Sequence, residues 1–185
     1  RKAVHTNNAV LMIVELDKAS EKLRKKLARK NVPVDEVMSS YDGFNISVYD
    51  GNVFIVGKNG RGTAYGILEM SRMAGVSPWI WWGDVVPERK SCLTINRNTS
   101  VTLGASVEYR GIFINDEDWS IRPWSEKGHK GLIGRDTYKK VFQLLMRLRA
   151  NAVWPAMHEG TVSFFKTPGA KDVADSCGIA VGSSH

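Results

Sequence analysis

The chain has 185 residues, of which 43% are hydrophobic, so it is long and apolar enough for one large domain or two small domains with packed cores. Its apolar stretches are far shorter than a membrane span, and no membrane partner is expected. The formal net charge of +7 suits an anionic partner. No zinc-finger, RNA-recognition or basic-zipper pattern accompanies that charge, so no nucleic-acid partner is expected either.

The first part of the chain predicts a strand followed by a basic helix. Residues 9–16 are almost continuously apolar, which is typical of a buried strand. Residues 18–30 are rich in lysine and arginine and end before Pro33. Leu23 and Leu27 are four positions apart and would face inward, which leaves the basic side chains on a solvated face.

A hairpin and a second helix are predicted next. Residues 44–48 alternate apolar and polar side chains, Asp50 and Gly51 form a turn signal, and residues 53–56 return. The glycine-rich stretch 57–62 lacks the residue order of a phosphate-binding loop, so it is interpreted as a strand-to-helix turn. The helix is expected from Thr63, its N-cap, to about residue 73.

The sequence predicts two domains. Residues 78–84 hold a dense group of tryptophans, which suit core packing or a ligand platform. From residue 87 to 107 the chain turns polar, and the domain boundary is expected near Ser106. We therefore expect an N-terminal α/β accessory domain over residues 1–105 and a second domain over residues 106–185.

Three short apolar runs organise the second domain, at residues 109–114, 152–156 and 179–182. An amphipathic helix separates the first two, and a shorter helical stretch separates the last two. Strand and helix in alternation predict adjacent parallel strands joined by right-handed crossovers. A closed (β/α)8 barrel needs eight such units and about 250 residues. The fold class expected is therefore α/β, with an N-terminal α/β domain followed by the first three units of a TIM barrel, which is incomplete in this chain. The helix before the second strand is expected to carry its apolar stripe on Tyr138, Val141, Phe142, Leu145 and Leu148.

Polar side chains follow each of these three strands. Residues 115–118 (NDED) follow the first, His158 and Glu159 follow the second, and His185 follows the third. The carboxyl ends of parallel strands meet at one rim, where α/β enzymes collect their chemistry. Paired acids and bases suit glycoside hydrolysis. The same side chains could ligate a divalent metal in a metal-dependent α/β hydrolase, or belong to a non-catalytic carbohydrate-binding fragment. A solvated acidic loop neutralised by Arg110 and Arg122 is a further alternative.

These residues carry a resemblance to a known family. Residues 109–119 (YRGIFINDEDW), 148–157 (LRANAVWPAM) and 178–185 (GIAVGSSH) look like glycoside hydrolase family 115, in that family's order and spacing. The resemblance implies a barrel enzyme preceded by an α/β domain. It also implies an α-glucuronidase that removes glucuronic acid, or its 4-O-methyl ether, from the 2-position of xylose in glucuronoxylan, with inversion and without a cofactor.

The resemblance and the strand-end positions together give the candidate site. The catalytic residues expected are Asp116 and His185, and no metal ligand is assigned. The expected substrate-binding residues are Asn115, Asp118, Trp154, His158 and Glu159. His158 departs from the family pattern, which has a tryptophan at this position in many relatives. A plant cell-wall polysaccharide or oligosaccharide is the expected partner, the full-length enzyme is expected to be a homodimer, and by resemblance the bacterial protein is expected to be periplasmic or secreted.

Overall fold

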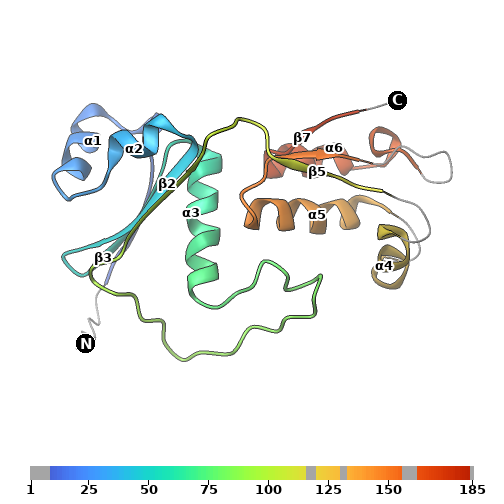
Figure 1. Cartoon of the computed structure of the whole chain (residues 1–185), viewed down its shortest axis with the longest axis horizontal. Coiled ribbons are helices and arrows are strands. Elements are labelled where there is room, and N and C mark those ends of the chain that lie inside the picture. Colours follow the sequence, from blue (N-terminus) through green and yellow to red (C-terminus); the bar gives the residue numbers. More distant parts are fainter. Residues whose placement is uncertain (1–8, 116–119, 130–132, 156–161, 184–185) are drawn as a thin grey trace. The chain divides into compact units, whose positions relative to one another are not determined.

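The computed structural model describes residues 9–115, 120–129, 133–155 and 162–183. The chain divides into two compact units, residues 1–108 and residues 109–185, and each is an assembly of strands and helices (Figure 1). No helix in the described ranges is long and apolar enough to cross a membrane.

The first unit is built on a four-stranded sheet. Its strands are β1 (Leu11–Glu15), β2 (Tyr41–Tyr49), β3 (Asn52–Gly57) and β4 (Ser100–Ala105), in the spatial order β1-β3-β2-β4. β1 runs parallel to β3, whereas β2 is antiparallel to both of its neighbours. The predicted first strand and hairpin are confirmed. The hairpin turns at Asp50 and Gly51, whose positive φ angles of 50° and 73° suit a tight turn between twisted strands.

Strand β4 lies within the polar stretch 87–107, where no strand was predicted. Val101 and Leu103 pair with Ile46 and Phe44 of β2, and the buried Asn45 donates from Nδ2 to Thr102 Oγ1 at 3.0 Å. β4 is an edge strand that no sheet neighbour covers on its outer side. Val101 and Leu103 alternate with Ser100, Thr102 and Gly104, which is a strand signal that was not used.

Two short helices follow β1. Helix α1 (Glu21–Ala28) is capped by Ser20, whose Oγ accepts from the Leu23 N–H at 3.3 Å, and it confirms the predicted basic helix. Helix α2 (Val34–Ser39) was not predicted, because six residues are too few to display a helical period. The core beside these helices contains the buried side chains Leu16, Leu27, Val32, Val37, Phe54 and Val56.

Helix α3 (Gly60–Met73) begins earlier than the sequence suggested. Its N-cap is Asn59 rather than Thr63, since the Asn59 Oδ1 accepts from the Gly62 N–H at 2.8 Å. Thr63 instead lies inside the first turn and donates from Oγ1 to the Asn59 carbonyl at 2.8 Å. A Cβ atom on Gly66 would lie 2.6 Å from the Ile55 side chain, so the glycine lets the helix lie close to the sheet.

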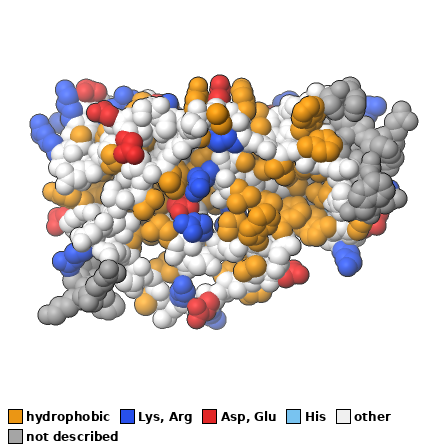
Figure 2. Space-filling model, in the orientation of Figure 1, with side chains coloured by type: hydrophobic (Ala, Val, Ile, Leu, Met, Phe, Trp, Pro, Cys, Tyr) orange, Lys and Arg blue, Asp and Glu red, His pale blue; other side chains and the backbone are white. Residues whose placement is uncertain are grey.

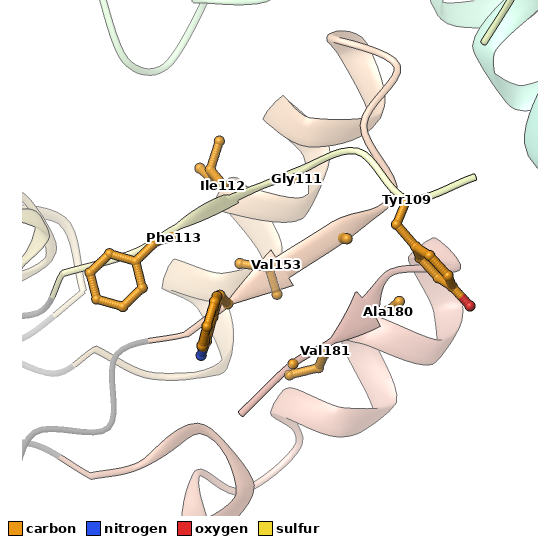
Figure 3. A pocket seen from close by; sticks show the side chains of 10 residues that line it. Tyr109, Gly111, Ile112, Phe113, Val153, Ala180 and Val181 are labelled. Carbon is orange, nitrogen blue, oxygen red and sulfur yellow. The ribbon is translucent and has the colours of Figure 1, made fainter. Parts of the chain in front are cut away.

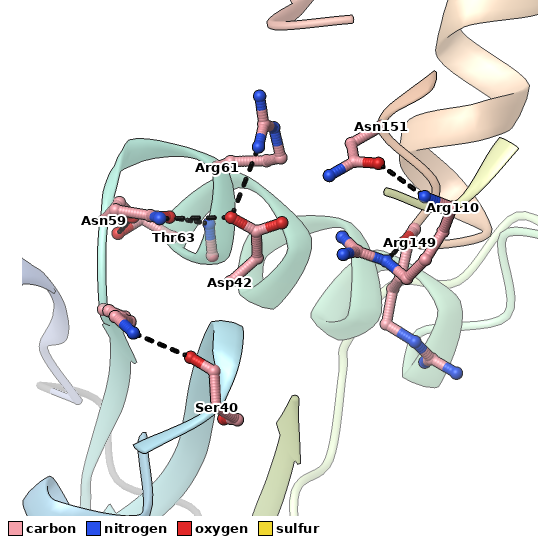
Figure 4. A network of polar contacts seen from close by, with 10 residues as sticks. Ser40, Asp42, Asn59, Arg61, Thr63, Arg110, Arg149 and Asn151 are labelled. Carbon is pink, nitrogen blue, oxygen red and sulfur yellow. Dashed lines mark hydrogen bonds and ion pairs between the residues drawn. The ribbon is translucent and has the colours of Figure 1, made fainter. Parts of the chain in front are cut away.

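The turn before α3 is held by a buried carboxylate. Asp42, at φ 48°, accepts from Asn59 Nδ2 at 3.1 Å and pairs with Arg61 at 3.4 Å (Figure 4). Lys58 donates from Nζ to the Ser40 carbonyl at 3.0 Å. These contacts tie β2 to the start of α3, and they support the interpretation of the glycine-rich stretch as a structural turn.

The second unit contains a three-stranded parallel sheet. Its strands β5 (Gly111–Phe113), β6 (Ala152–Trp154) and β7 (Ala180–Val181) lie in the order β5-β6-β7, which confirms the predicted adjacency, order and direction. Its helices are α4 (Ile121–Gly128), α5 (Arg135–Arg147) and α6 (Ala170–Cys177). Alternation of strand and helix is confirmed, whereas closure into a barrel stays a prediction.

The core of the second unit forms around α5. Four of the five predicted stripe residues are buried, namely Tyr138, Val141, Phe142 and Leu145, whereas Leu148 lies past the helix end and is exposed. The rings of Tyr138 and Phe164 meet edge to face at 4.8 Å. Helix α4 replaces part of the polar connection after the first strand. Its buried Ser125 lies 2.7 Å from Thr137 at the first turn of α5, hydroxyl to hydroxyl, so a polar contact joins α4 to α5.

Candidate functional site at the strand ends

The carboxyl ends of β5, β6 and β7 lie at one edge of the parallel sheet. The pairing continues just past the strands, because the Ile114 N–H donates to the Trp154 carbonyl at 2.8 Å and the Gly182 N–H donates to the Val153 carbonyl at 2.9 Å. The residues that follow the strands therefore leave the sheet from the same edge. Asn115 and Trp154 are the two predicted site residues that the structure describes at this edge.

Five predicted site residues lie outside the described residues: Asp116, Asp118, His158, Glu159 and His185. Their roles stay predictions based on their place in the sequence. Asn115, directly before Asp116, is half-buried, and its carbonyl accepts a hydrogen bond from the Ser120 hydroxyl. This contact connects the end of β5 to the residue before α4.

An aromatic pair lies on the sheet at this edge. Phe113 is in register with Trp154, and their rings meet edge to face with centroids 6.4 Å apart and planes at 89° (Figure 3). Both side chains are well exposed, at 60% and 46%. Phe113 was not predicted as a site residue. The available signal was its position near the end of the first predicted strand, residues 109–114.

A shallow hollow of about 440 Å³ extends from this pair across the sheet. Strand register aligns three small residues two positions before the aromatic pair, namely Gly111, Ala152 and Ala180. Their lack of side-chain bulk leaves the hollow open, and its remaining lining is apolar apart from the Tyr109 hydroxyl. Val153, on the middle strand, is buried with an exposed fraction of 2%.

The opposite end of the strands is fixed by backbone-directed contacts. The buried Asn151 accepts from the Arg110 N–H through Oδ1 at 2.8 Å, and Arg110 donates from Nε to the Arg149 carbonyl at 2.9 Å (Figure 4). These contacts hold the amino ends of β5 and β6 together, which positions the residues at their carboxyl ends.

Arg122, the other arginine considered as a partner for the acidic residues after β5, pairs within α4 with Glu126 at 3.1 Å.

The described part of this site offers shape and polar recognition rather than acid–base chemistry. Its aromatic rings can pack against the apolar faces of a ligand, and the Asn115 side chain carries both a hydrogen-bond donor and an acceptor. Within the described ranges, no three His, Cys, Asp or Glu side chains gather as a metal site would require. The groups that could move a proton are those predicted just beyond the strand ends.

Comparison with known proteins supplies the family. The model of glycosyl hydrolase family 115 matches residues 104–185. A solved structure described as a novel family GH115 4-O-methyl-alpha-glucuronidase, BtGH115A, with specificity for decorated arabinogalactans is 41% identical, with a TM-score of 0.80 over 98% of this chain. The structure of CpGH84D is 12% identical, with a TM-score of 0.55 over 98% of this chain and 28% of that chain, and shares the fold alone.

A comparison with curated proteins found no match. This chain spans 24% of the length of BtGH115A. The family match covers the strand ends described above, and the identity extends over nearly the whole chain. The chain belongs to glycosyl hydrolase family 115.

Proposed function

We propose that this chain is part of a glycoside hydrolase that removes glucuronic acid, or its 4-O-methyl ether, from a plant cell-wall polysaccharide. The observation that carries the proposal is the family match over the residues that form the strand-end rim. BtGH115A, which is similar over nearly the whole chain, is itself described as a 4-O-methyl-alpha-glucuronidase. In this proposal, residues 1–105 form an N-terminal α/β domain and residues 106–185 form the first three units of a (β/α)8 barrel.

The proposed reaction is inverting hydrolysis. A water molecule attacks the anomeric carbon of the glucuronic acid while an acid protonates the departing glycosidic oxygen, so the configuration at that carbon inverts. The two carboxyl groups that perform these steps lie about 6.5–9.5 Å apart to leave room for the water. Asp116 would hydrogen-bond a sugar hydroxyl or hold the attacking water, and His185 would bind the glucuronate ring. The chain covers a quarter of its relative's length, so further acid and base groups are expected elsewhere in the enzyme.

The substrate-binding residues proposed are Asn115, Asp118, Trp154, His158 and Glu159. Trp154 has the clearest physical support, because its exposed ring lies beside Phe113 at the edge of the hollow. Ring stacking needs no charge, so it can position a neutral xylose or galactose unit. Asp118 and Glu159 would accept hydrogen bonds from sugar hydroxyls.

Two polymers are candidates for the substrate. Glucuronoxylan, decorated at the 2-position of xylose, is the first. A decorated arabinogalactan is the second, since BtGH115A is described as having specificity for such polymers. Because these polymers lie outside the bacterial cell, we further propose that the enzyme is periplasmic or secreted. A homodimer is also proposed, by family resemblance.

The test is release of uronic acid by the complete enzyme that contains this chain. Equal masses of glucuronoxylan and of decorated arabinogalactan are incubated with it, and free glucuronic acid and its 4-O-methyl ether are quantified. Proton NMR during the first minutes shows the anomeric configuration of the product before it mutarotates. Initial release of the opposite anomer supports inversion, initial retention overturns the mechanism, and no release from either polymer overturns the proposed function.

A further inference from the structure

Helix α1 presents a row of basic side chains that the proposed active site does not use. Lys22, Lys26 and Arg29 are spaced at i, i+4 and i+7, which places them on one face of the helix, and all three are exposed. Arg29 is the C-cap and keeps helical backbone angles, so the row extends to the helix end. With a rise of 1.5 Å per residue, the row spans roughly 10 Å. Lys and Arg side chains gather over α1 in Figure 2, with acidic side chains beside them.

The other cations of this segment already have partners. Lys18 pairs with Glu15 at 3.1 Å and Lys25 pairs with Glu21 at 3.6 Å. Both inward-facing cations are also engaged. The Arg24 guanidinium donates twice to the Leu16 carbonyl, at 3.0 Å and 2.6 Å, and the Lys30 ammonium lies 4.3 Å from the centre of the Tyr49 ring.

The three cations of the row stand apart from this pattern. Among the described residues of this unit, Lys22, Lys26 and Arg29 form no ion pair, and residues 1–8 contain no acidic side chain. Asp35 and Glu36, in the first turn of α2, are the next acids along the chain and do not pair with the row. Three like charges on about two turns of helix repel one another, so an external polyanion would relieve that repulsion.

We propose that this basic row binds a carboxylate-bearing polysaccharide, which is the chemical class of polymer that the proposed hydrolase acts on. The inference rests on the proposed function for the identity of the polymer. Charge complementarity supports it, because uronate groups recur along such a polymer and meet cations that form no ion pair within the described part of this unit. A polyphosphate chain such as RNA would also meet the charge, but α1 carries no aromatic side chain on which bases could stack.

The test measures binding of the full chain to immobilised glucuronoxylan by biolayer interferometry at low ionic strength. The variant is Lys22→Gln/Lys26→Gln/Arg29→Gln. The matched control is Lys18→Gln/Lys25→Gln/Lys171→Gln, which removes the same charge from side chains that are paired with Glu15, Glu21 and Asp175. We expect Kd to rise about tenfold for the row variant and less than about twofold for the control, with the difference shrinking at high salt. Circular dichroism confirms that both variants fold.

Two control polymers test whether the basic row recognises uronate charge, and one hydrolysis assay tests the proposed function separately. Carboxyl-reduced glucuronoxylan keeps the sugar backbone without the charge and should bind at least about tenfold more weakly. Equal binding of this neutral polymer, equal loss in the control variant, or tighter binding of polyuridylic acid would each overturn the inference. Hydrolysis of short aldouronic acids by the complete enzyme tests the proposed function alone. If those are cleaved while the row variant binds glucuronoxylan like the wild type, only the docking surface is refuted.

Discussion

At the scale of single residues, Gly111 determines how closely β5 approaches β6. A Cβ atom at this position would lie 2.2 Å from the Ala152 carbonyl oxygen and 2.6 Å from its carbonyl carbon, so the backbone itself would have to move. We expect Gly111→Ala to lower the free energy of unfolding by about 2 kcal/mol, as overpacking of a rigid contact does. Urea unfolding followed by circular dichroism measures this loss.

Gly128 gives the matched control for that substitution. It is the last residue of α4, and a Cβ atom there would meet no atom of the described residues within 4 Å. Gly128→Ala should therefore leave stability unchanged within about 0.5 kcal/mol, or raise it slightly, because alanine favours helix. Equal losses of stability in the two variants would show that the close approach of β5 to β6 does not require a glycine at position 111.

Cys177 differs from Cys92 in its surroundings. Partial burial raises the pKa of the Cys177 thiol above its ordinary value of 9.0, and the positive charge of Lys139 opposes this only in part. Since the thiolate is the reactive form, we expect Cys177 to react with iodoacetamide at least about threefold more slowly than the exposed Cys92 at pH 8. Mass spectrometry of tryptic peptides over a labelling time course gives both rates, and Cys92→Ser confirms their assignment.

The same shift fixes the direction of its pH dependence. A pKa that is higher in the folded state means that folding favours the neutral thiol, so this contribution to stability is present below the unfolded pKa. It is lost as the pH rises through the folded pKa, that is, above about pH 9. Faster labelling of Cys177 than of Cys92 at pH 8 would contradict the burial that causes the shift.

At the scale of elements, the start of helix α3 shows which of two candidate residues, Asn59 or Thr63, caps the helix. Asn59 caps the helix and also donates to the Asp42 carboxylate, whereas Thr63 is bonded within the first turn. We expect Asn59→Ala to lower the free energy of unfolding by about 1–2 kcal/mol, since it removes an N-cap. Thr63→Ala should cost less than about 0.5 kcal/mol, because the lost hydroxyl bond is offset by better helix propensity. Chemical denaturation of both variants compares them, and a larger loss for Thr63→Ala would restore it as the cap.

The elements that could be predicted are those with a long or repeated pattern. Helix α5 displays its stripe over thirteen residues, and the hairpin combines alternation with an Asp-Gly turn, so local sequence was sufficient for both. Helix α2 has only six residues, and β4 is an edge strand whose partner β2 lies far away in sequence. The α3 boundary moved from Thr63 to Asn59 because the choice between two capping residues depends on Asp42, seventeen positions away from Asn59.

The candidate site likewise has a part that local sequence predicts and a part that it does not. Position after a strand was sufficient to predict that Asn115 lies at the carboxyl edge of the parallel sheet, whereas Trp154 was predicted as a substrate-binding residue and lies at the end of β6 itself. The partnership of Phe113 with Trp154 could not be predicted, because it depends on the register between β5 and β6, which are forty residues apart. Sequence spacing gives the face of a side chain within one strand but not the residue beside it on the next strand.

At the scale of the whole molecule, the chemistry depends on residues contributed by many strands. The chain spans 24% of BtGH115A and its second unit contains a three-stranded sheet in the described ranges, so catalysis is best tested in the complete enzyme. A carboxylate at the end of the first strand of the proposed barrel can help hold the attacking water or bind a sugar hydroxyl. We expect Asp116→Ala to lower kcat/KM for glucuronoxylan at least about tenfold, equivalent to roughly 1.4 kcal/mol of transition-state stabilisation.

His185→Ala should cause a loss of similar order if its imidazole binds the glucuronate ring, and it should act mainly through KM. Asp175→Ala is the matched control, because this carboxylate is exposed near the end of α6, which leads into the amino end of β7, and it pairs with Lys171 at 2.6 Å. Initial rates over a range of substrate concentrations separate kcat from KM, and circular dichroism verifies folding. Losses below about twofold for both Asp116→Ala and His185→Ala, matching the control, would place the sugar pocket elsewhere and leave only the fold assignment standing.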